Sequence, residues 1–94
     1  MVIYETYHEA EKNVMGDETI IPVTGGYGVV KYDEYRLRIR EEAASLYDGG
    51  WRAKDGEELV LEYCTEENDA TDEWKESIVA ELERIEDGKH GSAF

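Results

Sequence analysis

The amino-acid sequence predicts an α+β fold, in which a small antiparallel sheet of two to three strands is followed by two to three helices packed on one face. Residues 1–32 contain short runs of β-branched and aromatic residues separated by glycines, which is typical of strands joined by turns. Residues 33–87 contain apolar residues at helical spacing. With 94 residues the chain has the length of one domain, expected to span 1–94 and to end in a flexible tail at 88–94.

The N-terminal third is expected to be mainly strands. Side chains alternate in character over residues 2–7, and residues 19–24 form a β-branched run. Pro22 lacks a backbone N–H, so the second strand should lie at a sheet edge or end there. Two glycines then form a turn before a third strand at 27–32. Residues 9–14 fit a helical turn equally well.

Residues 33–47 fit two patterns. Apolar residues at positions 35, 37 and 39 alternate with arginines, which is a strand pattern. A helical stripe accounts for more residues, notably those at 41–47, and we therefore favour a helix. Asp33 is a suitable N-cap, and Gly49 with Gly50 provides a helix stop. A strand extending into residues 33–40 stays open as the alternative.

A short helix is expected to follow. Asp55 and Glu58 have nearly the spacing of a capping box, which marks a helix start. Leu59, Val60 and Tyr63 would then face the core. A polar loop should occupy 65–70.

The last helix has the clearest pattern. Thr71 is the expected N-cap, and acids in the first turn suit the helix dipole. Four apolar residues recur at intervals of four, four and three and predict a buried stripe: Trp74, Ile78, Leu82 and Ile85. Glu81 and Arg84 lie one turn apart and should form an ion pair. The sequence Asp87-Gly88 is expected to end the helix.

The charge of the chain is strongly negative and uneven. The formal net charge is −14, from 24 acids and 10 bases. Residues 1–54 carry −3, while residues 55–87 carry −12. Nucleic acid and anionic lipid would be repelled by such a chain, whereas a cationic groove would attract it. No stretch approaches the roughly 18 apolar residues of a membrane span, so no membrane partner is expected.

The acids of the C-terminal half have two interpretations. They form either a solvated helical face or an array that imitates phosphates. Duplex DNA carries one charge per ~1.7 Å of axis, and carboxylates on consecutive helix turns lie about 5.4 Å apart. Two adjacent acidic helices could therefore approach the charge density of one strand. The ten residues of this acidic set are Asp55, Glu57, Glu58, Glu62, Glu66, Glu67, Asp69, Asp72, Glu73 and Glu76.

Little in the sequence supports catalysis. His8 and His90 have no convincing nucleophile or orienting acid nearby in the chain. Cys64 is surrounded by glutamates, which would raise the pKa of its thiol and disfavour a reactive thiolate. Because a lone cysteine forms no internal disulfide, a reducing compartment is expected. We expect no enzyme activity, no cofactor and no metal site. Residues 66–73 lack the ligand spacing and central glycine of an EF-hand loop.

The segment 46–52 is the most distinctive. Its two glycines permit a tight reversal, with Tyr47 and Trp51 on either side. Trp51 would either fold onto the core behind a glycine helix cap or protrude as an aromatic anchor for a partner.

Residues 46–87 resemble the C-terminal half of small acidic phage-encoded anti-CRISPR proteins that inhibit Cas9. The resemblance rests on the pair Gly50-Trp51, followed by Asp55, Glu57 and Glu58 and a last acidic helix. It implies a DNA mimic that occupies the site where the nuclease reads the protospacer-adjacent motif with arginines. The acids from Asp55 to Glu76 would then face this basic groove.

The expected function is therefore inhibition by charge complementarity, with the acidic set and Trp51 in contact with the partner. The partner would be a basic nucleic-acid-binding protein such as a Cas nuclease or its guide-RNA complex. No direct binding of DNA or RNA is expected. The protein would act in the cytoplasm of the infected or host bacterium. The alternative is a non-catalytic interaction module of phage or bacterial origin that uses a tyrosine-rich sheet face: Tyr4, Tyr7, Tyr27 and Tyr32.

Overall fold

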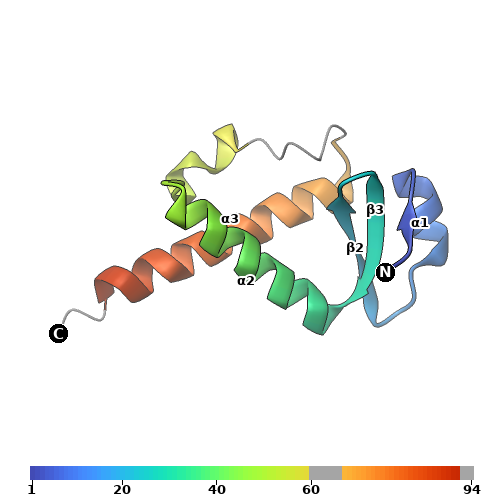
Figure 1. The fold of residues 1–94 in the computed structure, drawn as a ribbon, viewed down its shortest axis with the longest axis horizontal. Coiled ribbons are helices and arrows are strands. Elements are labelled where there is room, and N and C mark those ends of the chain that lie inside the picture. The colour runs from blue at the N-terminus through green and yellow to red at the C-terminus, as the bar shows by residue number, and fades with distance from the viewer. Residues whose placement is uncertain (60–66, 92–94) are drawn as a thin grey trace.

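The computed structural model describes residues 1–59 and 67–91, with side chains up to residue 88. The sequence-based expectations for residues 60–66 and for His90 lie outside this description. Figure 1 shows a small sheet beside two long crossing helices, an α+β arrangement as the sequence predicts. The elements in chain order are β1 (Ile3–Tyr4), α1 (Tyr7–Asn13), β2 (Glu18–Val23), β3 (Gly26–Lys31), α2 (Tyr32–Asp48), the 3-10 helix η1 (Ala53–Glu58) and α3 (Asp69–Gly91).

The sheet has three antiparallel strands in the order β1-β3-β2, so β3 is central. Gly28 is the pairing partner of Ile3 on one side and of Ile21 on the other. Pro22 lies in β2 at an edge of the sheet, which confirms its predicted position because edges tolerate the missing N–H.

The expected first strand is much shorter than residues 2–7. β1 ends at Tyr4, and Thr6 begins helix α1 by accepting a hydrogen bond from the Glu9 backbone N–H at 3.1 Å. The alternative prediction of a helical turn at residues 9–14 is therefore correct, since α1 covers most of this range. This N-cap outweighs the β-propensity of the segment, because it satisfies a backbone donor that a helix start would otherwise leave unpaired.

Helices lie on both faces of the sheet. Ile21 and Val30 belong to the core that also contains α2 and α3, so these two helices pack on one face as predicted. Tyr27 lies three residues from Val30 in β3 and therefore points to the opposite face. There its ring contacts the ring of Tyr7 in α1, with 5.9 Å between centroids. Helix α1 thus covers the second face (Figure 1).

Residues 33–40 are helical, because they lie within α2. The helix begins at Tyr32 with Lys31 in the N-cap position, two residues before the expected N-cap, so Asp33 lies in its first turn. The predicted glycine stop is confirmed. Gly50 has a φ of 98°, and the Trp51 N–H donates to the carbonyl oxygen of Leu46 at 2.9 Å. This is the bond pattern of a Schellman motif, which needs a left-handed residue that glycine adopts at little cost.

Between α2 and α3, the predicted short helix is a 3-10 helix that ends at Glu58. The side chain of Asp55 accepts a hydrogen bond from the Arg52 backbone N–H at 3.0 Å, so the start lies at Arg52 and not at Asp55. Leu59 follows the helix and is buried, as expected for a core residue.

Helix α3 begins at Asp69, before the predicted N-cap Thr71. The Asn68 side chain accepts a hydrogen bond from the Thr71 N–H at 3.1 Å, and the Thr71 hydroxyl accepts one from the Asn68 N–H at 2.9 Å. This reciprocal arrangement is a capping box with Asn68 as the N-cap. The predicted end at 87–88 is also wrong, because the helix continues to Gly91.

The core lies where α2 and α3 cross beside the sheet. Trp74, Ile78 and Leu82 of α3 are buried and Ile85 packs against them, which confirms the predicted stripe. Across from them, Tyr35 contacts the Trp74 ring edge-on at 5.6 Å.

Candidate acidic binding surface

Most members of the acidic set that the structure describes are exposed. Glu57 and Glu58 extend from η1, and Glu67 precedes α3. Asp55 differs, because its carboxylate is half-buried and caps η1. Glu62 and Glu66 lie outside the described residues. The remaining acids are exposed on α3: Asp69, Asp72, Glu73 and Glu76.

The four α3 acids share one side of the helix. At about 100° per residue, positions 69, 72, 73 and 76 fall within roughly 100° of the helix circumference. The buried stripe that starts at Trp74 occupies a different side. α3 therefore presents a continuous carboxylate face to solvent while it packs against the core.

A groove at the start of α3 adds two acids that the sequence analysis did not select. Asp69 and Glu73 line it together with Glu11 of α1 and Glu18 of β2, around a volume of about 210 Å³. No lysine or arginine is among the described residues that line this acidic groove. Four carboxylates from three elements are therefore concentrated here. Only the fold brings them together, because residues 11 and 73 are far apart in the sequence.

Tyr7 reports the negative potential of this groove. Partial burial raises the pKa of its phenol, and the charges of Glu11, Asp69 and Glu73 raise the pKa further. Burial disfavours the phenolate because the charged form loses hydration, and the carboxylates disfavour it because another negative charge would lie beside existing ones. The same potential favours an incoming cation.

A second groove lies between η1 and α3, around about 640 Å³. It is lined by Glu57 and Glu76 of the acidic set, by Glu83, and by the bases Lys54 and Lys75. The second groove therefore has mixed charge, and the acidic groove is the more negative of the two. The acidic set thus does not form one uniform array.

The segment around Trp51 is held together by local contacts. Trp51 is half-buried and packs against the core. This agrees with the first of the two alternatives, in which Trp51 folds onto the core behind the glycine helix cap. The Arg52 guanidinium lies over the ring of Tyr47 at 3.8 Å and donates to the Tyr47 carbonyl oxygen at 3.0 Å. Only the exposed part of the Trp51 ring is available to a partner.

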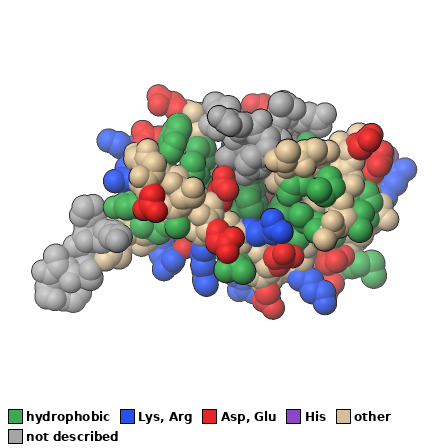
Figure 2. Space-filling model, in the orientation of Figure 1, with side chains coloured by type: hydrophobic (Ala, Val, Ile, Leu, Met, Phe, Trp, Pro, Cys, Tyr) green, Lys and Arg blue, Asp and Glu red, His purple; other side chains and the backbone are tan. Residues whose placement is uncertain are grey.

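Basic side chains gather elsewhere. Arg36 and Arg40 of α2 and Arg84 of α3 line a groove between these two helices. Figure 2 shows basic side chains along the lower edge of the molecule, interspersed with acidic ones. Arg36 and Arg84 are paired with the carboxylates of Asp33 and Glu81, so this groove is less negative than the acidic groove but is not a strongly basic surface.

The tyrosines of the alternative interface do not share one open face. Tyr27 is buried, and Tyr7 lies beside it in α1. Tyr32 is exposed but begins α2. The remaining tyrosine of this set is Tyr4, which lies in β1 and is half-buried.

His8 is an exposed residue of α1 and not of a strand. Among the residues that the structure describes, no group of three or more His, Cys, Asp or Glu side chains is arranged to hold a metal ion. Within 1–59 and 67–91, no helix combines the length and apolar character needed to cross a bilayer.

Comparison of the chain with protein-family models, with curated proteins and with solved structures finds no match.

Proposed function

We propose that this protein acts without catalysis, as an acidic ligand that occupies the basic nucleic-acid groove of another protein. The observation that carries this proposal is the acidic groove. Four carboxylates from α1, β2 and α3 line it without a lysine or arginine among its described lining residues. Such a site attracts cationic side chains, and electrostatic steering would make the association fast and sensitive to salt.

In its more specific form, the proposal is an anti-CRISPR-like inhibitor. The partner would be a CRISPR effector nuclease, free or with its guide RNA, and the acids would compete with target DNA in the bacterial cytoplasm. The continuous acidic side of α3 supports this form, because carboxylates one turn apart lie about 5.4 Å from each other. An effector channel is lined with positive charge for a nucleic-acid backbone.

Charge reversal tests the proposal. In the first variant, Glu11, Glu57, Glu73 and Glu76 are replaced by lysine. Glu11 and Glu73 line the acidic groove, and none of the four lies at the N-terminus of α3, so its dipole is little affected. The control replaces four exposed acids outside the acidic set, the acidic groove and the first turns of the helices: Glu5, Asp17, Asp48 and Asp87. Each variant changes the formal net charge from −14 to −6, since each substitution adds two units.

Purified Cas nucleases serve as baits at low and high salt, with target DNA as competitor. The unmodified protein is expected to bind one of them, to lose affinity as salt rises and to be displaced by DNA. The first variant should bind far more weakly than the control variant. Equal binding by the two variants would show that net charge alone, and not this surface, determines association. Salt-independent capture of a protein unrelated to nucleic acid would refute the proposal.

A further inference from the structure

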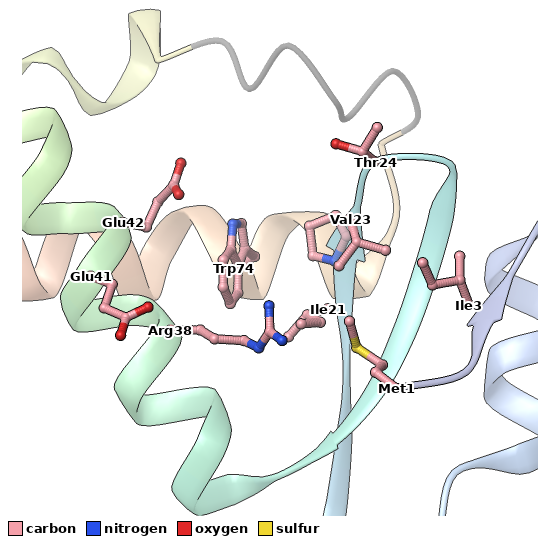
Figure 3. A pocket seen from close by; sticks show the side chains of 10 residues that line it. Met1, Ile3, Ile21, Val23, Thr24, Arg38, Glu41, Glu42 and Trp74 are labelled. Carbon is pink, nitrogen blue, oxygen red and sulfur yellow. The ribbon is translucent and has the colours of Figure 1, made fainter.

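An apolar groove lies between α2 and the β2–β3 turn, on the face of the sheet opposite α1. It encloses about 450 Å³ and has Ile21 of β2 and Trp74 of α3 among its lining residues. Figure 3 shows Arg38 reaching from α2 toward Ile21 and Met1, with Val23 on the strand side. We call this site the apolar groove; it is separate from the acidic groove described above.

The apolar groove continues into an exposed apolar surface. Ile21 and Trp74 are themselves 1% and 4% exposed, so the innermost residues belong to the core. At its outer end, Met1, Val2 and Ile3 are 57%, 66% and 49% exposed. Consecutive exposed apolar residues beside a cavity are typical of an interaction site.

Arg38 brings a polar atom into this apolar site. Its Nη2 atom donates to Glu34 Oε1 at 3.3 Å. Its Nε atom is buried and has no hydrogen-bond partner in the structure. A buried donor without an acceptor is destabilising, so a bound molecule that draws the flexible Arg38 side chain outward and supplies an acceptor would be favoured. A backbone carbonyl oxygen of a peptide has the required chemistry.

The α2 side of the apolar groove is acidic. Glu41 and Glu42 line it there, and Glu41 is exposed (Figure 3). Together with the net charge of −14, these carboxylates favour a cationic occupant over an anionic one.

We propose that the apolar groove binds a basic peptide segment of the partner through one apolar side chain. That side chain packs against the accessible lining residues Met1 and Ile3, above Ile21 at the base of the groove. A neighbouring backbone carbonyl accepts from Arg38 Nε once the flexible arginine side chain shifts and exposes this atom, and an adjacent lysine or arginine meets Glu41. The basic character of the segment rests on the proposed function; the apolar pocket and the unpaired donor do not. Such an apolar anchor would supply the affinity that salt-sensitive carboxylates alone provide poorly.

The test uses a synthetic peptide, Lys-Lys-Leu-Lys-Lys with blocked ends, titrated into the isotope-labelled protein and followed through backbone amide signals. A matched peptide has serine in place of leucine. The leucine peptide should shift signals of both grooves, whereas the serine peptide should shift those of the acidic groove alone. In a Trp51→Phe background, emission from Trp74 should change with the leucine peptide only.

Protein variants locate the site. Ile3→Ser and Arg38→Lys should each weaken binding of the leucine peptide by roughly tenfold, as for an interface anchor. Leu37→Ser is the control for Ile3→Ser, since Leu37 is 53% exposed and lies outside the apolar groove. Circular dichroism verifies the fold of each variant. Arg38→Lys keeps the charge but removes the Nε donor together with the Nη2 contact to Glu34. Glu34→Ala, which removes only the partner of Nη2, separates the two losses.

Two results would overturn the proposal. In the first, the leucine and serine peptides shift the backbone amide signals of the apolar groove equally, or neither shifts them at millimolar concentration. The other is a concentration-dependent shift of the same signals without peptide, together with a dimer by light scattering, which would make a second copy the occupant. Because neither outcome involves a nuclease, failure here is distinguishable from failure of the proposed function.

Discussion

The phenolic oxygen of Tyr27, in the central strand, accepts a hydrogen bond from Nδ2 of Asn68 at 2.8 Å. Asn68 also caps α3 through its other side-chain atom, Oδ1. One amide therefore connects the sheet to the first turn of the longest helix. Asp69 follows it directly and lines the acidic groove. The position of this groove thus depends on Asn68.

Replacing Asn68 by alanine should destabilise the protein by about 1–3 kcal/mol, because the variant loses an N-cap and a hydrogen bond to a buried tyrosine. Urea unfolding measures the change. Asn68→Ser is the control, since serine retains the cap but does not reach Tyr27. The free energy of unfolding of Asn68→Ser should lie between those of the unmodified protein and Asn68→Ala. A loss shared equally by Asn68→Ser and Asn68→Ala would mean that the cap contributes nothing.

Alkaline unfolding should depend on Tyr35. Burial raises the pKa of its phenol, and the hydrogen bond with Ser77 at 2.8 Å partly opposes that rise. The phenol of the unfolded chain, with a pKa near 10, ionises first. The neutral Tyr35 phenol therefore contributes its full stabilisation to the fold below about pH 10. This contribution is lost as the pH rises through the higher pKa that Tyr35 has in the folded protein.

Ultraviolet titration of tyrosinate tests this directly. Ser77→Ala should move the ionisation of Tyr35 to still higher pH, because it removes the hydrogen bond that lowers the pKa. Tyr35→Phe should abolish the late-titrating step assigned to this residue. An unchanged titration in Ser77→Ala would contradict the assigned role of the hydroxyl.

Acid unfolding should depend on Glu81. The Arg84 guanidinium donates to the Glu81 carboxylate, with 2.9 Å between Nε and Oε1, and this hydrogen bond lowers the pKa of Glu81. The pair thus stabilises the fold above the ordinary glutamate pKa of about 4.3, and this contribution disappears as the pH falls through the lower folded-state value. Glu81→Gln should therefore be slightly less stable than the parent at pH 7 and equal to it in strong acid. Glu83→Gln, at an exposed neighbouring position, is the control in urea unfolding at both pH values.

Gly56 fixes the approach of η1 to α3. A Cβ atom at this position would lie 2.6 Å from Cγ2 of Val79, too close for an undistorted contact. Gly56→Ala should therefore cost about 1–3 kcal/mol through overpacking. Gly16→Ala is the matched control, because nothing lies within 4 Å of a Cβ there. A combined Gly56→Ala, Val79→Ala variant that does not recover stability would show that the clash is not the cause.

Periodicity predicted the elements that are buried on one side. The stripe from Trp74 to Ile85 and the edge position of Pro22 follow from local chemistry, and the structure confirms both. Helix starts were predicted less well. Asn68 is the N-cap of α3 because its side chain reaches the Thr71 N–H. Asparagine is a somewhat better N-cap than threonine, but both are favourable, and the acids that follow Thr71 suit a helix start there as well.

The acidic groove was only partly predictable. Asp69 and Glu73 follow from the charge run in the sequence, whereas Glu11 and Glu18 join them through packing of α1 against the sheet. The prediction of strand for residues 5–7 excluded that packing. The unpaired Nε of Arg38 also has no signal in the sequence, because it depends on the direction in which α2 leaves the sheet.

The two edges of the sheet are both blunted. β1 has only two residues, and β2 carries Pro22. Short edge strands and edge prolines are means by which natural proteins prevent strand-by-strand polymerisation. Despite three consecutive exposed apolar residues at its start, the chain offers a poor template for cross-β growth. A partner that docked by extending the sheet would find few backbone groups to pair with, so recognition of this protein is left to its side chains.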